Sequence, residues 1–219
     1  MKVICIIPAR IGSIRIRKKN IIDFKGKPLI YWSLTQSKRV KIFNSTIVSS
    51  DSNSLLIYAK KKFKKSIIDF RPKKLSTYKS KTESLISYLI KKYKLSSKDA
   101  IMILQPTSPL RADKDIKNTI KIFRRNKLKT LHSASIYDKK KIIKKHSNIY
   151  DNKNKKADRS CKYSYNGAIY LFRVNYFNKT KKIYEKVPKI YLMDKKHSID
   201  IDNYNDLKGY SNFDINIAC

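Results

Sequence analysis

Short apolar runs alternate with longer amphipathic stretches along residues 1–135 of the chain. The apolar runs, which predict buried strands, cover residues 2–9, 45–51, 66–70, 99–106 and 130–135. The amphipathic stretches, which predict helices, cover residues 28–39, 52–63, 82–95 and 113–126. Strands that are apolar along their whole length are buried on both faces, which is typical of parallel sheets. The pattern therefore predicts an α/β fold with a mainly parallel, Rossmann-like sheet and helices on both faces.

The pattern changes after this region. Residues 137–165 are polar, rich in lysine and weakly periodic, which predicts either a loose insert or a protruding arm. Strands resume at 167–174 and 189–193, and residues 198–210 predict a strand end, a loop and a short helix. Because no linker or repeat interrupts the chain, we expect a single domain over residues 1–219 with 137–165 as its arm.

Charge and composition narrow the class of protein. The net charge is +36, from 52 basic and 16 acidic residues, and 41% of the residues are hydrophobic. Most of the basic residues are lysines scattered along the whole chain, whereas a nucleic-acid surface favours arginine among aromatic residues. Nucleic-acid binding is therefore the less favoured interpretation. The spacing of the three cysteines and three histidines predicts no zinc site, and the apolar runs are too short to span a membrane, so we expect a cytoplasmic protein.

A basic loop follows the first strand. It carries Gly12 and Ser13, which let a backbone approach a ligand closely, and it holds five cations: Arg10, Arg15, Arg17, Lys18 and Lys19. Ligands of open α/β sheets bind beyond the carboxyl ends of the strands, and backbone N–H groups with cations suit a polyphosphate. The loop matches neither the Walker nor the GxGxxG pattern. The alternative interpretation is a basic surface loop in a basic protein.

Two later segments favour a ligand site. "LQPTSPLR" follows the fourth strand and places the polar Gln105 beside two prolines that stiffen the turn. In "SIDIDNYND", Asp200 and Asp202 are two residues apart, so in an extended segment both side chains point to one side. Two carboxylates on one side suit Mg²⁺, a cation that prefers oxygen ligands. The alternative is an acidic surface pair. Asp206 is expected to be a charge at the start of the following helix rather than a third ligand.

These segments together resemble a known family. "IPARIGSIRIRKKNIIDFKGKPLI", "IVSSD", "FRPKKLS", "ILQPTSPLR", "NGAIYLF" and "SIDIDNYNDL" occur in the order found in the acylneuraminate cytidylyltransferases, and they span residues 3 to 208. The resemblance implies a nucleotidyltransferase sheet, and it implies that CMP is transferred from CTP to a nine-carbon 2-keto acid sugar. It also implies Mg²⁺ as cofactor, and a homodimer in which the arm reaches the partner's sugar pocket. A loose loop is the alternative for the arm.

The resemblance also implies roles for single residues. Lys19 and Arg10 match catalytic cations, with Lys19 on the α-phosphate. The nucleotide would be held by Arg10, Gly12, Ser13, Lys19, Asn20, Arg71 and Thr82, with Arg15 supplying a cation that the family carries one position earlier. The sugar would be held by Gln105, Lys156, Asn166 and Tyr170. Asp200 and Asp202 match the Mg²⁺ ligands.

The chain departs from the family at several of its motif positions. Ile14 replaces a usual lysine, Arg17 a usual proline, Tyr78 an acidic residue and Ser164 an arginine. Ser164 and Lys156 concern the sugar carboxylate, so they leave the identity of the sugar open. The candidate sugars are sialic, legionaminic and pseudaminic acids, with 3-deoxy-manno-octulosonate less favoured. The alternatives from other classes are a basic nucleic-acid-binding protein and an inactive homologue on the same scaffold.

Overall fold

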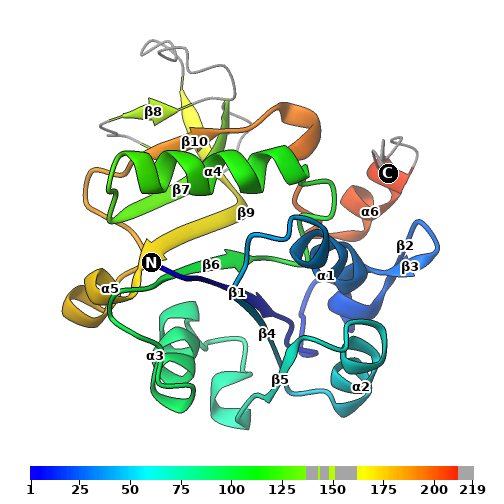
Figure 1. Ribbon diagram of the computed structural model, residues 1–219. Helices are drawn as coiled ribbons and strands as arrows, with labels where there is room; N and C mark the ends of the chain where they lie inside the picture. The colour runs from blue at the N-terminus through cyan, green and yellow to red at the C-terminus, as the bar shows by residue number, and fades with distance from the viewer. Residues whose placement is uncertain (137–142, 144–147, 151–161, 212–219) are drawn as a thin grey trace.

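The computed structural model describes residues 1–136, 143, 148–150 and 162–211 (Figure 1). Its main sheet has eight strands: β1 (Val3–Pro8), β4 (Ser45–Ser50), β5 (Ile67–Phe70), β6 (Ala100–Leu104), β7 (Thr130–Ile136), β8 (Ile149–Tyr150), β9 (Tyr163–Arg173) and β10 (Ile190–Leu192). A small hairpin consists of β2 (Asp23–Phe24) and β3 (Lys27–Pro28). The α-helices are α1 (Leu29–Arg39), α2 (Asn53–Lys62), α3 (Thr82–Lys92), α4 (Asp113–Arg125), α5 (Val174–Thr180) and α6 (Tyr204–Ser211). Three short 3₁₀ helices are η1 (Lys19–Ile21), η2 (Lys73–Leu75) and η3 (Lys195–His197).

The order of the strands in the main sheet is β5-β4-β1-β6-β9-β7-β10-β8. Each strand pair is parallel except the two that β9 forms, with β6 on one side and β7 on the other. The prediction of a mainly parallel sheet is confirmed, with one long antiparallel strand at its centre. Strand β9 pairs with β6 and so brings the second half of the chain against the first. Residues from both halves therefore meet beyond the same ends of these strands.

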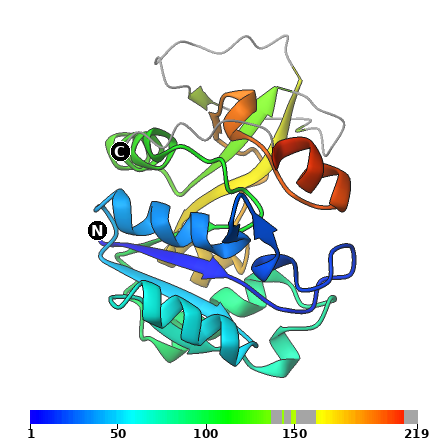
Figure 2. The same cartoon turned by 90° about the vertical axis from the view of Figure 1, so that its right-hand side faces the viewer.

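Helices cover both faces of the sheet, as the pattern predicted (Figures 1 and 2). The side chains of β1 alternate between the faces. Val3, Cys5 and Ile7 pack in the cluster that contains buried residues of α1, α2 and α4. Ile4 and Ile6 pack with buried residues of α3 and α5. This three-layer arrangement explains why the strands are continuous apolar runs rather than alternating ones.

Lysine occupies backbone positions at helix ends where glycine is usual. Lys41, Lys94 and Lys127 follow α1, α3 and α4 with φ of 49°, 47° and 49°, in the left-handed region. At the end of α4, Lys127 N donates to Arg124 O at 3.2 Å and Leu128 N to Phe123 O at 3.1 Å. These two bonds are those of a Schellman cap, whose left-handed residue costs a non-glycine side chain some strain. The chain has only four glycines, and it closes these helices without them.

Three local features differ from the sequence prediction. Strand β9 begins at Tyr163, so residues 163–165 belong to the main sheet and not to the predicted arm. Tyr163 is 1% exposed, because β-prone aromatic residues pack well against the neighbouring strand even in a lysine-rich sequence. Helix α5 was not predicted, since its seven residues are too few to give a clear helical period. The β2–β3 hairpin was also missed: it turns at Lys25 and Gly26, both with positive φ, and lacks the usual Asn-Gly signal.

Candidate active site

A cleft of about 330 Å³ lies beyond the carboxyl ends of β1, β5 and β6, where the parallel-sheet rule predicted a ligand site. Its lining comes from four segments that are far apart in the sequence: the end of β1 with the basic loop that follows, the loop after β5 with the start of α3, the loop after β6, and the segment before α6. The residues that line it are Pro8, Arg10, Ser13, Ile14, Arg15, Lys19, Asn20, Arg71, Ser80, Thr82, Leu85, Gln105, Pro106, Thr107, Asp200 and Asp202.

The basic loop is anchored at both of its ends. Ile11 N donates to Asp51 Oδ1 at 2.8 Å, and the Asn20 side chain donates to Arg10 O at 2.7 Å. Ile16 is buried in a small core beneath the loop. Of the five cations, Arg10, Arg15 and Lys19 line the cleft, whereas Arg17 and Lys18 are exposed and are not among its described lining residues. A Cβ at Gly12 would meet only Ser76 O, at an ordinary 3.9 Å, so packing among the described residues does not require this glycine.

The acidic segment shows the alternation that its sequence predicted. Ile199 and Ile201 are buried in the small core beneath the basic loop, and Asp200 and Asp202 face the cleft. Ile201 N donates to Thr107 O at 2.8 Å, which ties the segment to the loop after β6. The prediction that both carboxylates lie on one side is confirmed.

Asp206 holds the end of this segment. Its Oδ2 accepts from Asp202 N at 2.8 Å and from Asn203 N at 3.0 Å, while Asn203 Oδ1 accepts from Asp206 N at 2.9 Å. This reciprocal arrangement is a capping box at the start of α6. Asp206 therefore acts as a helix-end charge, as predicted, and it also fixes the backbone of Asp202.

The cations and carboxylates meet at Asp202. Lys19 Nζ lies 3.1 Å from Asp202 Oδ1 and donates to Ile201 O at 3.1 Å. Arg15 reaches the same Asp202 oxygen, at 3.2 Å. Lys19 is mostly buried, so its charge acts in a medium less polar than water, where its effect on a bound anion is larger. The cleft therefore presents cations next to carboxylates. An anionic ligand can bind the cations while a metal cation binds the carboxylates.

The loop after β5 and the start of α3 contribute Arg71, Ser80 and Thr82 to the cleft. Arg71 is buried, and its Nε lacks a hydrogen-bond partner among the described residues. Burial, and after it the charge of Arg10, lowers the pKa of Arg71 below its ordinary value. Thr82 is the first residue of α3, whose free N–H groups favour an anion or a polar ligand. An unpaired buried donor next to a helix start favours a ligand with several acceptor oxygens.

Neutral and aromatic side chains lie next to Gln105, outside the residues that line the cleft. Tyr170 hydrogen-bonds the side chains of Gln105 and Tyr184, and burial raises the pKa of Tyr170 above its ordinary value. A Cβ at Gly167, whose φ is +75°, would lie 3.6 Å from Asp200 Oδ2 and 3.7 Å from the Tyr170 hydroxyl. These are ordinary contact distances, so the positive φ rather than a lack of space favours glycine here. Tyr170 thus places a neutral hydrogen-bonding group near Asp200.

The predicted nucleotide residues other than Gly12 line one cleft, together with both predicted metal ligands and Gln105. Asn166 and Tyr170 are not among the lining residues. Asn166 is buried, with its Oδ1 accepting from Ser133 Oγ at 2.6 Å and its Nδ2 donating to Ser198 Oγ at 2.9 Å. We correct its role from a sugar contact to a link between β7, β9 and the acidic segment. Lys156 lies outside the described residues.

Sequence reasoning missed Ser80 and Thr107 as cleft residues. Thr107 belongs to the quoted "LQPTSPLR" motif, so its place in the motif was the available signal. Ser80 has no local pattern that distinguishes it from other serines, because it reaches the cleft through the fold of the loop before α3.

The donor set fits a cation held jointly with a ligand. Among the described residues there is no cluster of three or more His, Cys, Asp or Glu side chains that could hold a metal ion. Asp200 and Asp202 offer carboxylate oxygens in a cleft whose other charged lining residues are all cations. Mg²⁺ is often bound by one or two carboxylates with water and phosphate oxygens, so this pair suits it when a phosphate ligand completes the site.

A cation-lined cleft at the carboxyl ends of a mainly parallel sheet defines a nucleotide-binding α/β protein. Its fold is similar to that of a solved CMP:2-keto-3-deoxy-manno-octonic acid synthetase complexed with CTP. The TM-score is 0.69 at 16% identity, over 96% of this chain and 97% of that chain. The cytidylyltransferase family model matches residues 4–213. The chain belongs to the cytidylyltransferase family, as the resemblance in its motifs implied.

The chain is also similar to two curated cytidylyltransferases. It is 28% identical over 216 residues to the N-acylneuraminate cytidylyltransferase of Escherichia coli O18:K1:H7, covering 94% of this chain and 51% of that protein. It is 29% identical over 219 residues to the pseudaminic acid cytidylyltransferase of Campylobacter jejuni serotype O:2, covering 95% of this chain and 94% of that protein. The chain thus spans about half the length of the first relative and nearly all of the second. Within the part of the chain that the structure describes, no helix has the length and apolar character needed to cross a membrane.

Proposed function

We propose that this protein transfers CMP from CTP to the anomeric hydroxyl of a nonulosonic acid and releases pyrophosphate. In this reaction a bond forms between the hydroxyl oxygen and the α-phosphorus, the bond from the α-phosphorus to the bridging oxygen of pyrophosphate breaks, and the hydroxyl proton is released to solvent. The reaction requires cations along the triphosphate and two reactants held in line. The family membership and the charge pattern of the cleft support the proposal.

The observation that carries it is the meeting of Lys19 with the Asp200–Asp202 segment inside a cleft lined by Arg10 and Arg71. Lys19 is mostly buried and sits between the basic loop and the acids, so it would contact the α-phosphate. A fixed cation there stabilises negative charge that grows as pyrophosphate leaves. Arg10 and Arg15 would hold the outer phosphates. Arg71, Ser80 and Thr82 would take up the donors and acceptors of the nucleoside.

Asp200 and Asp202 would hold Mg²⁺ between themselves and the phosphates. A bound Mg²⁺ supplies positive charge that offsets the repulsion between these carboxylates and a triphosphate. The chain's own contribution is to present both oxygens on one side, through the burial of Ile199 and Ile201 and the hydrogen bond from Ile201 N to Thr107 O.

The sugar would lie beside Gln105, which lines the cleft and is hydrogen-bonded to Tyr170. Hydroxyl and amide groups of such a sugar match the hydrogen-bonding capacity of these side chains. The printed names of the two relatives differ in their sugar, an N-acylneuraminate in one and pseudaminic acid in the other. The proposal is therefore made for the class of nonulosonic acids.

The test is a measurement of pyrophosphate release with CTP, UTP, ATP and GTP, each against a panel of sialic, legionaminic and pseudaminic acids and 3-deoxy-manno-octulosonate. We expect release with CTP and at least one nonulosonic acid. Equal release from UTP would overturn the cytidylyl assignment, and release only with the octulosonate would overturn the sugar class. No release with any pair, together with salt-sensitive retardation of random RNA, would favour the basic-binder alternative.

A Mg²⁺ titration of the same reaction tests whether Asp200 and Asp202 form the metal-binding site. Asp200→Asn and Asp202→Asn are each expected to raise the Mg²⁺ concentration for half-maximal rate about tenfold or more. Asp206→Asn is the matched control, because its side chain keeps an oxygen that can accept from Asp202 N. Its titration curve is expected to stay within about twofold of the native curve. Coincident curves for the native protein and Asp202→Asn would remove the metal from Asp202.

We also infer a homodimer, on the resemblance of the segment 137–165 to the family's arm. Most of this segment lies outside the described residues, and its last three residues form part of β9. Light scattering at micromolar concentration tests the inference, and a monomer mass would reject it.

A further inference from the structure

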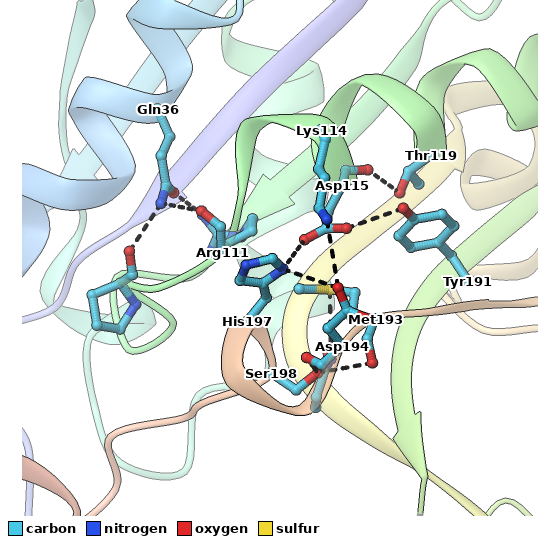
Figure 3. Close-up of polar contacts among 12 residues, drawn as sticks. Gln36, Arg111, Lys114, Asp115, Thr119, Tyr191, Met193, Asp194, His197 and Ser198 are labelled. Carbon is cyan, nitrogen blue, oxygen red and sulfur yellow. Dashed lines mark hydrogen bonds and ion pairs between the residues drawn. The ribbon is translucent and has the colours of Figure 1, made fainter. Parts of the chain in front are cut away.

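A buried polar network lies beside the acidic segment and outside the cleft lining (Figure 3). At its centre is Asp115, in the first turn of α4, whose side chain is fully buried. Asp115 Oδ1 accepts from the Tyr191 hydroxyl at 3.1 Å. Asp115 Oδ2 lies 3.2 Å from His197 Nδ1, which is an ion-pair distance without the alignment of a hydrogen bond. The network therefore joins α4, β10 and the 3₁₀ helix η3.

The network holds a buried carboxylate, which is costly unless nearby groups compensate it. Arg111 is buried close enough to interact electrostatically with Asp115. Its own hydrogen bonds, however, go to Gln36 Oε1 at 2.6 Å, Gln105 O at 2.8 Å and Ala168 O at 2.8 Å. His197 approaches Asp115 directly and from a different element, so this contact joins η3 to α4.

His197 ends η3 and stands three residues before Asp200. The turn around it is closed by His197 N donating to Asp194 O at 3.0 Å and by Ser198 Oγ donating to Asp194 O at 2.9 Å. Asn166 Nδ2 donates to Ser198 Oγ at 2.9 Å. From there the chain runs straight into the alternating segment. The segment is therefore held at its start by the contacts of His197 and Ser198, and at its end by the capping box of Asp206.

We propose that His197 is a positioning residue for the carboxylate pair. Through its contact with Asp115 it fixes the direction in which the chain enters the Ile199–Asp202 segment, and so sets the affinity of Asp200 and Asp202 for a divalent cation bound with CTP. The inference rests on the proposed function, in which this pair holds Mg²⁺. Residues that support metal ligands in this way change metal affinity by about 10- to 100-fold when they are lost.

The test measures cation binding without turnover. Mn²⁺ is titrated into the protein with CTP and no sugar, and binding is followed by the relaxation rate of water protons. His197→Ala is expected to weaken Mn²⁺ binding about tenfold. His197→Asn places an amide nitrogen near the position of Nδ1. This variant is expected to bind Mn²⁺ within about threefold of the native protein, which is a smaller change than the loss of one contact to a charged group would cause. If His197→Ala fails to fold, His197→Gln, whose amide lies farther from Asp115, replaces it with the same expected loss.

Tyr191→Phe is the matched control. It removes the donor to the other oxygen of Asp115 and lowers the melting temperature, but it leaves the His197 contact in place, so Mn²⁺ binding is expected to stay native. Native Mn²⁺ binding by His197→Ala would overturn the inference. Equal weakening in His197→Ala and Tyr191→Phe would also overturn it, because the role would then be stability alone.

Asp202→Asn separates this inference from the proposed function. If Asp202→Asn loses Mn²⁺ binding while His197→Ala keeps it, the positioning role of His197 is rejected and the metal site at Asp202 is supported. If Asp202→Asn binds Mn²⁺ as the native protein does, both the metal site and the positioning role are rejected.

Discussion

The two sides of the cleft that carry charge are built in opposite ways. The basic loop is anchored at its ends, but three of its cations, Arg15, Arg17 and Lys18, are exposed, and the Arg15 side chain is 64% exposed. The acidic segment is held along its whole length, by Ile201 N on Thr107 O, by the capping box of Asp206 and by the buried isoleucines, and the Asp202 side chain is 20% exposed. One side carries long, exposed cationic side chains, and the other is a segment held by hydrogen bonds and buried side chains.

The difference follows from what each side would bind. Long cationic side chains can follow phosphate groups that move as a bond breaks, and their exposure keeps the cost of reorganising them small. A small divalent cation demands near-ideal geometry from its oxygen ligands, so carboxylates that serve it must be fixed by their neighbours. The Lys19–Asp202 ion pair is where these two sides join.

The largest expected effect is at that junction. Lys19→Ala is expected to lower kcat about 10²- to 10³-fold, because it removes a preorganised cation that acts mainly on charge formed in the transition state. CTP binding should weaken much less. Single-turnover pyrophosphate release and CTP calorimetry separate the two quantities. Lys18→Ala, at the exposed neighbouring position, is the control and should be near native. A loss confined to CTP affinity would contradict the assigned role.

Acid is expected to lower the stability of the fold through His132, which lies in β7 of the main sheet. Burial lowers the pKa of His132 from 6.5 to about 3, and the ring lies against Tyr170 and Tyr184. The unfolded chain therefore binds a proton below pH 6.5 that the folded chain does not. The His132 contribution to stability is complete above pH 6.5 and is lost as the pH falls toward 3, by up to about 1.4 kcal/mol per pH unit.

His132→Gln tests this contribution. The glutamine amide can still donate to Ile183 O, which His132 Nε2 contacts at 2.9 Å, but it does not titrate. Urea unfolding at pH 7 and pH 5 is expected to show a drop in the free energy of unfolding that is about 2 kcal/mol smaller in the variant than in the native protein. Equal drops would mean that His132 is not buried as a neutral group.

A smaller effect is expected on the basic side. Arg15→Ala is expected to raise the KM for CTP about three- to tenfold with kcat nearly unchanged, because an exposed cation contributes about 1 kcal/mol to an ionic contact. The effect should shrink as salt rises from about 0.05 to 0.5 M, since salt screens exposed charges. Arg17→Ala is the control in the same loop. A salt-independent effect would show that Arg15 is shielded from solvent and would weaken the contrast between the two sides.

The smallest effect lies far from both sides. Lys127→Gly should stabilise the protein by about 0.5–1 kcal/mol, because glycine adopts the left-handed cap after α4 without strain. Lys121→Gly, inside α4, should destabilise it by about 1 kcal/mol. Thermal unfolding measures both. Pyrophosphate release should be native in Lys127→Gly, and a change there would show that the rigidity of the cleft depends on distant helix caps.

The fold could be predicted from the sequence wherever the period of apolar residues was the deciding signal. Strands buried on both faces and helices with one apolar face follow from local pattern alone. The Ile-Asp-Ile-Asp alternation likewise placed two carboxylates on one side before any tertiary structure was known. The beginning of β9 could not be predicted in this way, because Tyr163 and Ser164 are buried by pairing with β7, a contact between distant parts of the chain.

The sequence predicted those site residues whose type and spacing already indicate their chemistry. The cations of the first loop and the acid pair have charges whose chemistry is plain from residue type and spacing. Asn166 was assigned to the sugar because it stands in a recognisable motif, but its amide is taken up by Ser133 and Ser198. His197 carries no local signal at all, since its contact with Asp115 spans 82 positions, the distance between residues 115 and 197.

The position of β9 also has a consequence for how the chain is made. In the finished sheet β7 pairs with β9 on one side and β10 on the other, and both of these strands follow β7 in the sequence. As the chain leaves the ribosome, β7 emerges with neither neighbour available and must wait for at least 27 more residues, those from 137 to 163, before pairing can begin. An apolar strand with two open edges readily pairs with other chains. Slow translation or heat during that interval should therefore favour aggregation of nascent chains, even though the finished protein has β7 covered on both edges.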